Sequence, residues 1–393
     1  MLNRLKIIST LCMLCLVPSL VIAEPQNETG IAVRKISPPN LNPDHLGKKI
    51  LCYRPMRRGA PNMTVEVINN KVIANNYGHG GSGWTLGPGS ADYVDNLLIN
   101  STYAKDLKKD TPITIIGAGV IGLYTAYDLE QKGYTNLTIV ADKFESLTSH
   151  NAGGLLDPVS MDNDPAMQNV INKIGIDSYK FYASIANKQN SIFKFGAVIV
   201  PTYFEDRENS GLEPYVGAVM HPAKDVLLDF GNGTTRKMVV YDDGIFIDTA
   251  TMMTELTAYL KSKHVVFKKK NIKSFKDINS KYIFNCAGLG AQQLKNDQEM
   301  VSVQGHLIML KDQKPQEMQY MILVYFGNDQ TASGQKITRS FYVFPKHLPG
   351  TGVNDVGVIG GTFIEGATRK TPNNEEFDTM IKNARKFYGI EPK

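Results

Sequence analysis

The sequence predicts an α/β protein of two domains, the first built on a Rossmann-type βαβ unit. A β-branched run, Ile113–Ile116, precedes the glycine fingerprint Gly117-Ala118-Gly119-Val120-Ile121-Gly122, and a helical pattern continues to Lys132. A second apolar run, Asn136–Ala141, ends at Asp142, about 20 residues after the fingerprint. The 393 residues, 42% hydrophobic and 21% charged, suit a globular chain long enough for two domains.

The glycine fingerprint carries the chemistry of this unit. Glycines keep the strand-to-helix turn tight and let the backbone approach a pyrophosphate, which the helix N-terminus binds through its free N–H groups. Asp142 stands where an acid accepts hydrogen bonds from ribose hydroxyls. A structural turn is the alternative for the fingerprint, and a solvated strand end is the alternative for Asp142. A nicotinamide and a flavin dinucleotide both satisfy the unit.

The first 23 residues are typical of a secretory signal. Arg4 and Lys6 form a basic start, an apolar run extends from Ile7 to Ile22, and cleavage is expected after Ala23. The run is shorter than the roughly 20 residues that span a bilayer, which disfavours an uncleaved membrane anchor. We therefore expect an exported protein, periplasmic or secreted, with no membrane partner once the signal is cleaved.

Charge and cysteine content exclude other classes. The formal net charge is +5, and removing the two positive charges of the signal leaves about +3 without long basic runs, so nucleic acid is not an expected partner. Two of the four cysteines lie in the signal, and we expect Cys52 and Cys286 to be buried free thiols. No spacing of cysteine and histidine is typical of a metal site.

The rest of the chain mixes strand and helix patterns without an internal repeat. Residues 24 to about 46, rich in proline, predict a polar arm, and we expect the folded part to begin near Lys48. Helices are predicted at Ala166–Ala186, Thr249–Ser262 and Asn374–Phe387. Strands are predicted within Phe193–Tyr203, Val265–Lys269, Lys281–Gly288, Gln319–Tyr325, Ser340–Phe344 and Asp355–Gly361.

Two segments ahead of the fingerprint carry a family resemblance. Tyr53-Arg54-Pro55 and Asn76-Tyr77-Gly78-His79-Gly80-Gly81-Ser82-Gly83-Trp84-Thr85 resemble the flavin and substrate clamp that closes the chain of the D-amino-acid oxidases. In that family the fingerprint opens the chain, so this sequence resembles a circularly permuted relative from about residue 48 to 393. The resemblance implies FAD as cofactor, bound by the Rossmann-type domain, and a second α+β substrate domain built on an antiparallel sheet.

The resemblance also implies a set of cofactor-binding residues. The fingerprint and the adenosine-binding strand end supply Gly117, Ala118, Gly119, Val120, Ile121, Gly122, Asp142 and Lys143. The next loop, the small-residue approach to the flavin ring and the strand pair near the adenine supply Thr148, Ser149, Gly153, Gly154, Leu155 and Ile272. The clamp supplies Gly80, Ser82, Gly83, Trp84 and Thr85. A helix over Ser90–Leu98 would direct its positive end at the flavin.

Three residues are implied to bind the substrate. Arg54 matches the family's carboxylate-binding arginine, whose planar guanidinium holds a carboxylate by two parallel hydrogen bonds. A surface ion pair is the alternative. Tyr342 matches a tyrosine that contacts the same carboxylate, although a tyrosine in such a strand is more often a core residue. Gly81 matches the glycine whose carbonyl faces the substrate amine.

Three positions depart from the family pattern. Thr338 stands where a second, lid-borne tyrosine is expected. Gln304-Gly305-His306 replaces an Arg-Gly-Gln motif, and we expect its histidine to have a packing role. Phe363 follows a Gly-Gly-Thr motif where the branch with acidic substrates has arginine. This disfavours an acidic substrate, although Arg339 or Lys336 would be able to supply the charge.

The resemblance implies an FAD-dependent oxidoreductase acting on CH–NH2 donors, through oxidative deamination of D-amino acids by hydride transfer to flavin. The products would be an imino acid that hydrolyses to a keto acid and ammonia, and H2O2. A D-amino acid and O2 are thus the expected partners, without a metal. Two alternatives stay open: a related oxidase or dehydrogenase of glycine or another amine, and an exported flavin-binding module without turnover.

The expected organisation has seven parts. They are the signal 1–23, the arm 24–46, a permuted segment 47–110 that completes the FAD and substrate site, the Rossmann βαβ 111–160, a substrate-domain part 161–250, a return to the FAD domain 251–300 and a second substrate-domain part with a lid 301–393. In a permuted chain, the end of the C-terminal helix near Tyr388 must lie close to the start of the Arg54 strand near Lys48.

Overall fold

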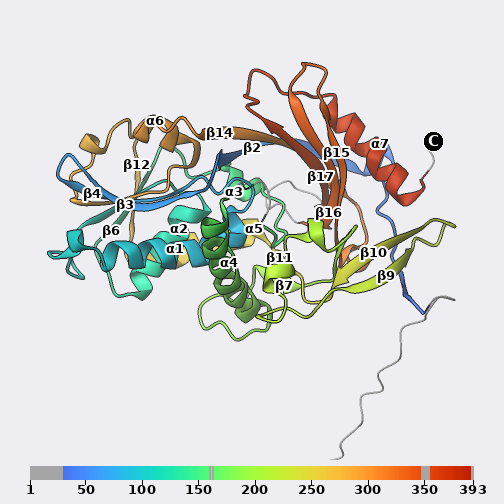
Figure 1. Ribbon diagram of the computed structural model, residues 1–393, viewed down its shortest axis with the longest axis horizontal. Coiled ribbons are helices and arrows are strands. Elements are labelled where there is room, and N and C mark those ends of the chain that lie inside the picture. The colour runs from blue at the N-terminus through green and yellow to red at the C-terminus, as the bar shows by residue number, and fades with distance from the viewer. Residues whose placement is uncertain (1–29, 159–160, 162, 347–354, 391–393) are drawn as a thin grey trace, which may run out of the picture.

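Two large β-sheets organise the chain into two lobes, seen left and right in Figure 1. The structure is a computed structural model and describes residues 30–158, 161, 163–346 and 355–390. The expected signal at residues 1–23 lies outside these ranges, so export stays a prediction. Within these ranges, no helix is both long enough and apolar enough to cross a bilayer.

The left lobe contains a six-stranded sheet in the order β12-β6-β5-β13-β4-β3. In chain order, its strands are β3 (Asn62–Ile68), β4 (Lys71–Tyr77), β5 (Ile113–Ile116), β6 (Leu137–Ala141), β12 (Val266–Lys269) and β13 (Tyr282–Asn285). Neighbouring strands are parallel except β3, which forms an antiparallel hairpin with β4. Counted from β5, the parallel strands have the doubly wound order 3-2-1-4-5, but the fifth, β4, precedes the first in the chain.

Helices cover one face of this sheet. α1 (Gly83–Ile99) and α2 (Val120–Gln131) pack on each other and on the sheet, α4 (Pro165–Ala186) packs on α1, and α5 (Thr249–Ser262) packs on α2. The opposite face is covered by apolar side chains of the segment before β13, which pack on those of β4, β5, β6 and β13. The strand-helix-strand unit predicted from the fingerprint is confirmed.

The helix expected at Ser90–Leu98 begins earlier, at Gly83, and this corrects the prediction. Gly87, Pro88 and Gly89 argue against a helix at the sequence level. Close packing explains the glycines: a Cβ on Gly87 would lie 2.7 Å from the Tyr124 ring, and one on Gly89 would lie 2.2 Å from the carbonyl oxygen of Ile174. Tertiary packing therefore overrides local propensity in the first turns of α1.

The right lobe contains a nine-stranded sheet in the order β1-β9-β10-β8-β15-β16-β17-β14-β2. Neighbouring strands are antiparallel except for the parallel pairs β1-β9 and β8-β15. Its strands are β1 (Ala32–Lys35), β2 (Leu46–Arg57), β8 (Thr202–Phe204), β9 (Lys224–Asp229), β10 (Thr235–Tyr241), β14 (Met300–Lys311), β15 (Met321–Gln330), β16 (Lys336–Pro345) and β17 (Asp355–Glu365). The expected second domain, α+β on an antiparallel sheet, is confirmed.

Smaller elements connect the lobes. β7 (Ala197–Ile199) and β11 (Ile245–Ile247) form a separate antiparallel pair. α3 (Thr148–Asn151) follows β6, and α6 (Ala291–Lys295) follows β13. The long strands β2 and β14 pair with each other and extend along the top of Figure 1 from one lobe to the other. The left lobe thus begins where β2 ends.

Alternation along the strands of the right lobe decides which side chains face the cavity between the lobes. Tyr342 and Phe344 belong to the core shared with the left lobe. Their neighbours Phe341 and Val343 point to the other face and pack under α7 (Glu376–Tyr388). Because successive side chains of a strand point to opposite faces, the apolar pattern of β16 fixes the orientation of Tyr342.

The arm expected at residues 24–46 is partly ordered, which corrects the expected start near Lys48. β1 (Ala32–Lys35) pairs with β9 at the sheet edge, and Ile36 and Leu41 are buried in the core beneath α7. These apolar side chains dock the arm because they bury surface between the sheet and the helix. Among the residues that the structure describes, the folded part therefore begins at β1.

The C-terminal helix lies beside the chain that leads into β2. Arg385 of α7 donates a hydrogen bond to the carbonyl oxygen of Leu41 at 2.8 Å, and Lys49 lies 3.4 Å from the carboxylate of Asp378. These contacts place the helix as a whole beside that segment, but neither joins Tyr388 to Lys48, so the spatial condition for a permuted chain stays a prediction. Permutation itself remains a proposal.

Candidate active site

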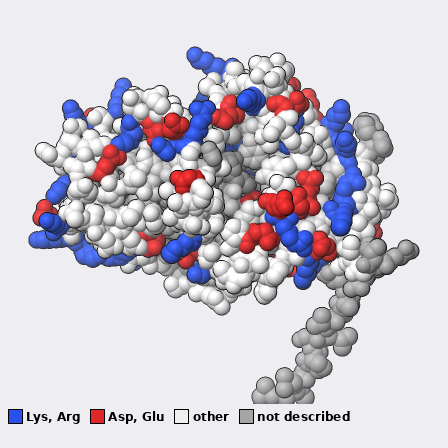
Figure 2. Space-filling view, viewed as in Figure 1, with Lys and Arg blue, Asp and Glu red and all other residues white. Residues whose placement is uncertain are grey.

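A cavity of about 1150 Å³ lies between the lobes, at the carboxyl ends of the parallel strands. This volume exceeds the roughly 300–1,000 Å³ of an ordinary small-molecule pocket. The end of each parallel strand contributes to its wall, and the right lobe contributes side chains from β2, β15 and β16. On the face shown in Figure 2, Lys and Arg side chains are interspersed with Asp and Glu over both lobes.

Most of the predicted site residues line this cavity. They are Arg54, Gly80, Gly81, Gly83, Trp84, Gly117, Ala118, Gly119, Val120, Ile121, Asp142, Lys143, Thr148, Ser149, Gly153, Gly154, Leu155, Ile272 and Tyr342. Gly122, Ser82 and Thr85 are not part of the lining. The individual roles of all these predicted residues stay predictions. The structure shows that segments far apart in the chain together form the wall of one cavity.

The fingerprint glycines fit a dinucleotide. Gly117 has φ +110°, and a Cβ there would lie 2.3 Å from the carbonyl oxygen of Cys286. Gly119 is the N-cap of α2, and because it has no side chain, the start of the helix is open to the cavity. Gly122 lies behind the wall, where a Cβ would lie 2.0 Å from the carbonyl oxygen of Gly117. Its role is therefore close packing of helix on strand.

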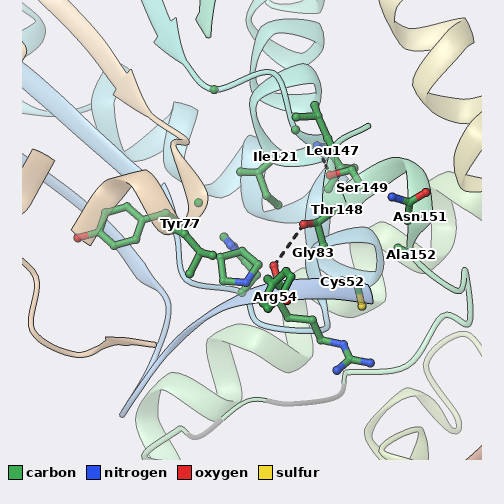
Figure 3. A pocket seen from close by; sticks show the side chains of 18 of the residues that line it. Cys52, Arg54, Tyr77, Gly83, Ile121, Leu147, Thr148, Ser149, Asn151 and Ala152 are labelled. Atoms are coloured by element: carbon green, nitrogen blue, oxygen red, sulfur yellow. Dashed lines mark hydrogen bonds between the residues drawn. The ribbon is translucent and has the colours of Figure 1, made fainter. Parts of the chain in front are cut away.

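The loop after β6 joins the adenosine end of the wall to the substrate end. The Ser149 hydroxyl accepts a hydrogen bond from the Val120 N–H at 3.0 Å, at the first turn of α2. Trp84 donates from its indole to the Ser149 carbonyl at 2.9 Å. The Thr148 hydroxyl donates to the carbonyl of Tyr53 at 3.2 Å, so that Thr148 lies beside the strand that carries Arg54 (Figure 3).

The small-residue loop that follows is held by the right lobe. A Cβ on Gly153 would lie 2.3 Å from the Phe344 ring, and Gly154 accepts a hydrogen bond from the Ile247 N–H at 2.7 Å. Lys346 donates to the carbonyl of Ala152, and burial lowers the pKa of Lys346 to about 8. The backbone of this loop is therefore held in place, and its two glycines have no side chain that would prevent the close approach of a flat ring.

The clamp contains an unpaired polar group at the cavity. His79 is buried, and neither of its ring nitrogens has a partner among the described residues. Burial lowers the pKa of His79 to about 4, so the imidazole is neutral at physiological pH. A buried polar group without a partner is costly in the protein interior. α1 begins four residues later and directs its N-terminus at the same region.

Arg54 is a buried cation at the substrate end of the cavity. Only 9% of its surface is exposed. Its Nη1 donates to the Thr362 carbonyl at 3.0 Å, its Nη2 lies 3.4 Å from the Tyr342 hydroxyl, and its guanidinium lies 4.5 Å from the centre of the Phe363 ring. It forms no salt bridge with a described residue. Since a guanidinium has five N–H donors, several remain for a ligand.

Glycine at position 305 makes room for this guanidinium. A Cβ on Gly305 would lie 2.6 Å from Nη2 of Arg54. The next residue, His306, binds the Thr362 hydroxyl at 2.7 Å and the Pro372 carbonyl at 3.0 Å, and Thr362 in turn holds Arg54. His306, which departs from the family's Arg-Gly-Gln motif, therefore helps to position Arg54 through Thr362. This positioning comes in addition to the packing role that the sequence predicts for His306.

Arg339 and Lys336, the two residues expected to be able to supply a positive charge to the substrate, do not line the cavity. Arg339 donates to both carboxylate oxygens of Glu376 at 2.9 and 2.6 Å and also pairs with Asp329, so it is not a free cation at the cavity. Lys336 is exposed, and Thr338 donates to the Asn328 side chain at 2.7 Å. This corrects the suggestion that Arg339 or Lys336 supplies charge to the substrate site. The alternation of β16 turns Arg339 toward α7.

Tyr342 is fixed by packing. Its ring stacks on Phe344 with centroids 4.8 Å apart and planes inclined by 13°. A Cβ on Gly360 would lie 2.0 Å from this ring. Burial raises the pKa of Tyr342 to about 12, against the opposing effect of the Arg54 charge, so the hydroxyl keeps its proton at neutral pH. It can therefore donate to a carboxylate bound by Arg54.

Replacing Tyr342 with phenylalanine is expected to raise KM for an amino-acid substrate about 5- to 30-fold, because one hydrogen bond of about 1–2 kcal/mol is lost while the ring stacking remains. Affinity for FAD should not change. Steady-state kinetics on the FAD-loaded variant provide the measurement, with Tyr103→Phe, 46% exposed, as the matched control. Unchanged KM would remove Tyr342 from the substrate site.

One acid on the cavity wall, Asp157, and the phenol of Tyr325 were not predicted. Tyr325 of β15 is within electrostatic range of Arg54, Tyr342 and Asp157, which all affect its pKa. Asp157 follows the small-residue loop and lines the cavity. The hydroxyl of Thr85, a residue predicted to bind the cofactor, donates to the Asp157 carbonyl at 2.9 Å and accepts from the Asp157 N–H at 3.0 Å. No sequence spacing links these positions.

Comparisons with known proteins identify the family of this chain. The model of the FAD dependent oxidoreductase family, DAO, matches residues 112–393. A D-amino-acid oxidase of Dictyostelium discoideum is 26% identical over 284 residues, which cover 69% of this chain and 71% of that protein.

Solved structures with a similar arrangement include two oxidases. Glycine oxidase from Bacillus cereus ATCC 14579 has 13% identity and a TM-score of 0.49, over 70% of this chain and 77% of that one. Iminodiacetate oxidase from Chelativorans sp. BNC1 has 15% identity and a TM-score of 0.47, over 70% of this chain and 79% of that one.

The family match begins immediately before β5 and extends through more than half of the chain. β2, β4 and the start of α1, which supply Arg54 and the clamp, precede it. The glycine-rich turn at the start of α2, the order of the parallel strands and the match of residues 112–393 all agree with an FAD-binding domain of this family. The chain belongs to the FAD dependent oxidoreductase family, DAO, and its cofactor is FAD.

Proposed function

We propose that this protein catalyses the oxidative deamination of D-amino acids, acting on their CH–NH2 group. One observation carries the proposal. The guanidinium of Arg54 is buried at the cavity, held by the Thr362 carbonyl and close to the Tyr342 hydroxyl, and forms no salt bridge with a described residue. A buried cation with unused donors favours a ligand carboxylate, because a charge left unpaired in the interior is costly.

The chain's own residues would bind and orient the substrate. Arg54 and the protonated hydroxyl of Tyr342 hold its carboxylate, and the Gly81 carbonyl accepts a hydrogen bond from its amine. Bound FAD supplies the two-electron oxidant for the Cα–H bond, with O2 as the proposed final acceptor and H2O2 as the product. No side-chain base is needed when the amine arrives neutral, so orientation in a buried cavity provides the rate.

The D configuration rests on the relative. The 26% identical protein of Dictyostelium discoideum is named a D-amino-acid oxidase, and its match covers two thirds of this chain. Phe363 stands where the branch with acidic substrates has arginine, and its ring centre lies 4.5 Å from the Arg54 guanidinium. This supports the exclusion of acidic side chains.

We also propose that residues 47–110 correspond to the closing segment of the family's chain, moved to the front. β4 takes the fifth position of the parallel sheet although it precedes the first strand in sequence, and it pairs with β13 from Val72 to Asn75. The contact of Arg385 with Leu41 supports a short connection between the ancestral neighbours.

An anaerobic absorbance spectrum of the FAD-loaded protein tests the function. Bleaching of the flavin bands by D-amino acids but not by their L-enantiomers, with H2O2 on re-aeration, is the expected result. Bleaching only by glycine or a secondary amine would replace D-amino acids with another amine substrate. Bound flavin that no amine bleaches would contradict the proposal in favour of a binding module without turnover.

A further inference from the structure

Lys346 is a buried cation beside the loop that lines the cavity between the lobes. Of the lysines and arginines in the described part of the chain, only Arg54 and Lys346 are buried, and Lys346 is 3% exposed. Its ammonium contacts a carbonyl and a hydroxyl, and no carboxylate of a described residue pairs with it. A charge buried without a counter-ion is costly, because burial removes it from water. The substrate contacts proposed for Arg54 do not explain this second charge.

The position of Lys346 follows from strand β16. Phe344 packs against Gly153 of the loop, and because side chains alternate along a strand, Lys346 points to the same side. Its Nζ donates to the Ala152 carbonyl at 2.5 Å and to the Thr249 hydroxyl at 3.0 Å. Ala152 lies on the cavity wall (Figure 3). The ammonium is therefore fixed directly behind the loop, on its protein side.

Lys346 is not alone in holding this loop. The Thr249 hydroxyl donates to the same Ala152 carbonyl at 3.2 Å, and the Ile247 N–H donates to the Gly154 carbonyl at 2.7 Å. Both contacts exist without the ammonium. Because hydrogen bonds from neutral groups already hold the loop, hydrogen bonding alone does not explain why a charge is buried here.

The amine of Lys346 carries its charge at neutral pH. Burial lowers the pKa of Lys346 to about 8, and nearby Asp248 and Cys52 oppose this effect. At pH 7 roughly nine in ten molecules are therefore protonated at this position. The loop thus has a positive charge at a defined place behind it.

FAD gains negative charge when it is reduced, because a hydride brings two electrons and one proton to a neutral ring. A fixed cation in the protein stabilises charge that develops in this way. We propose that Lys346 stabilises reduced FAD from behind residues 152–155 and so raises the reduction potential of the cofactor. At an effective dielectric constant of about 20, unit charges about 12 Å apart still change an equilibrium about tenfold, so direct contact is not required.

The inference rests on the predicted approach of this loop to the flavin ring. It concerns FAD alone and needs no amino-acid substrate. The proposed oxidation of D-amino acids can therefore fail while the role of Lys346 stands, and the role of Lys346 can fail while that function stands.

Lys346→Met removes the charge and the donors but keeps the length of the side chain. We expect affinity for reduced FAD to fall at least about 10-fold relative to oxidised FAD, which lowers the potential of a two-electron couple by about 30 mV. Equilibration of the FAD-loaded protein at pH 7 with a dye of known potential provides the measurement. Lys336→Met, at an exposed position of β16, is the matched control and should keep the wild-type potential. An unchanged potential in Lys346→Met would overturn the inference.

Lys346→Gln distinguishes the charge from the hydrogen bond, because an amide donates without being charged. We expect its potential to fall as far as that of Lys346→Met. A wild-type potential in Lys346→Gln would mean that a donor is sufficient, and it would overturn the assignment of the charge.

Thermal unfolding and affinity for oxidised FAD separate this role from a structural one. Because Thr249 keeps the Ala152 carbonyl bonded and no ion pair is broken, FAD-free Lys346→Met should unfold at or above the wild-type temperature. Its affinity for oxidised FAD, followed through Trp84 fluorescence, should stay within about threefold of wild type. A lower unfolding temperature together with a wild-type potential would make Lys346 a structural residue and overturn the inference.

Discussion

Arg54→Ala is expected to raise KM for amino-acid substrates about 100- to 1000-fold, because a buried, charge-assisted contact with the carboxylate is lost. The change also leaves the Thr362 carbonyl and the Tyr342 hydroxyl without the guanidinium that donates a hydrogen bond to each of them. Affinity for FAD should be retained, since the guanidinium is held at the substrate end. Steady-state kinetics and an FAD titration measure the two effects separately.

Two comparisons sharpen this experiment. Arg54→Lys keeps the charge but loses the planar fork, so an intermediate KM is expected. Arg58→Ala removes a neighbouring surface arginine that pairs with Glu365 and should leave the kinetics unchanged. An Arg54→Ala enzyme with wild-type KM would mean that Arg54 does not bind the substrate, and the proposed function would lose the observation that carries it.

Gly122→Ala is expected to destabilise the FAD-binding lobe by about 3 kcal/mol and to weaken FAD binding about 100-fold. The added Cβ would lie 2.0 Å from the Gly117 carbonyl oxygen, which is backbone and has no rotamer to change. α2 must therefore move away from β5, and the cradle at Gly119 moves with it. Trp84 is the only tryptophan of the chain and lines the cavity, so quenching of its fluorescence by FAD reports binding.

Gly290→Ala provides the control for this substitution. A Cβ on Gly290 would lie 3.5 Å from the Ala287 Cβ, an ordinary contact, although this residue also lines the cavity. Wild-type FAD affinity and unfolding temperature are expected for it. If Gly122→Ala binds FAD as well as Gly290→Ala does, the fingerprint packs less tightly than the structure indicates.

Local patterns in the sequence predict most of the left lobe. The fingerprint between two β-branched runs predicts β5, α2 and β6 to within a residue or two, because a βαβ unit is determined by contacts among near neighbours. The motif resemblance predicts Arg54 and Tyr342. Local propensity does not predict the first turns of α1. Gly87 and Gly89 are there because of close packing, but in the sequence they indicate a loop.

Long-range contacts explain what the sequence does not predict. The docking of β1 depends on an edge strand and a helix almost 200 and 350 residues away, respectively. Asp157 lines the cavity beside Thr85, 72 residues earlier, and no spacing marks it. His306 was expected to pack, yet its contact with Thr362, 56 residues later, links it to Arg54. Contacts of this kind can be identified only from the three-dimensional structure, because the residues are far apart in the sequence.

The place of β4 in the left lobe has a consequence for how the protein is made. β4 pairs with β13, and Asn75 receives a hydrogen bond from Asn285, 210 residues later. The hairpin β3-β4 therefore emerges from the ribosome long before its parallel neighbour exists, and closing so long a loop delays the pairing. Arg54 and the clamp are thus synthesised early, but they complete the site only after β13 and Tyr342 have been made, and until then β4 exposes an unpaired strand edge.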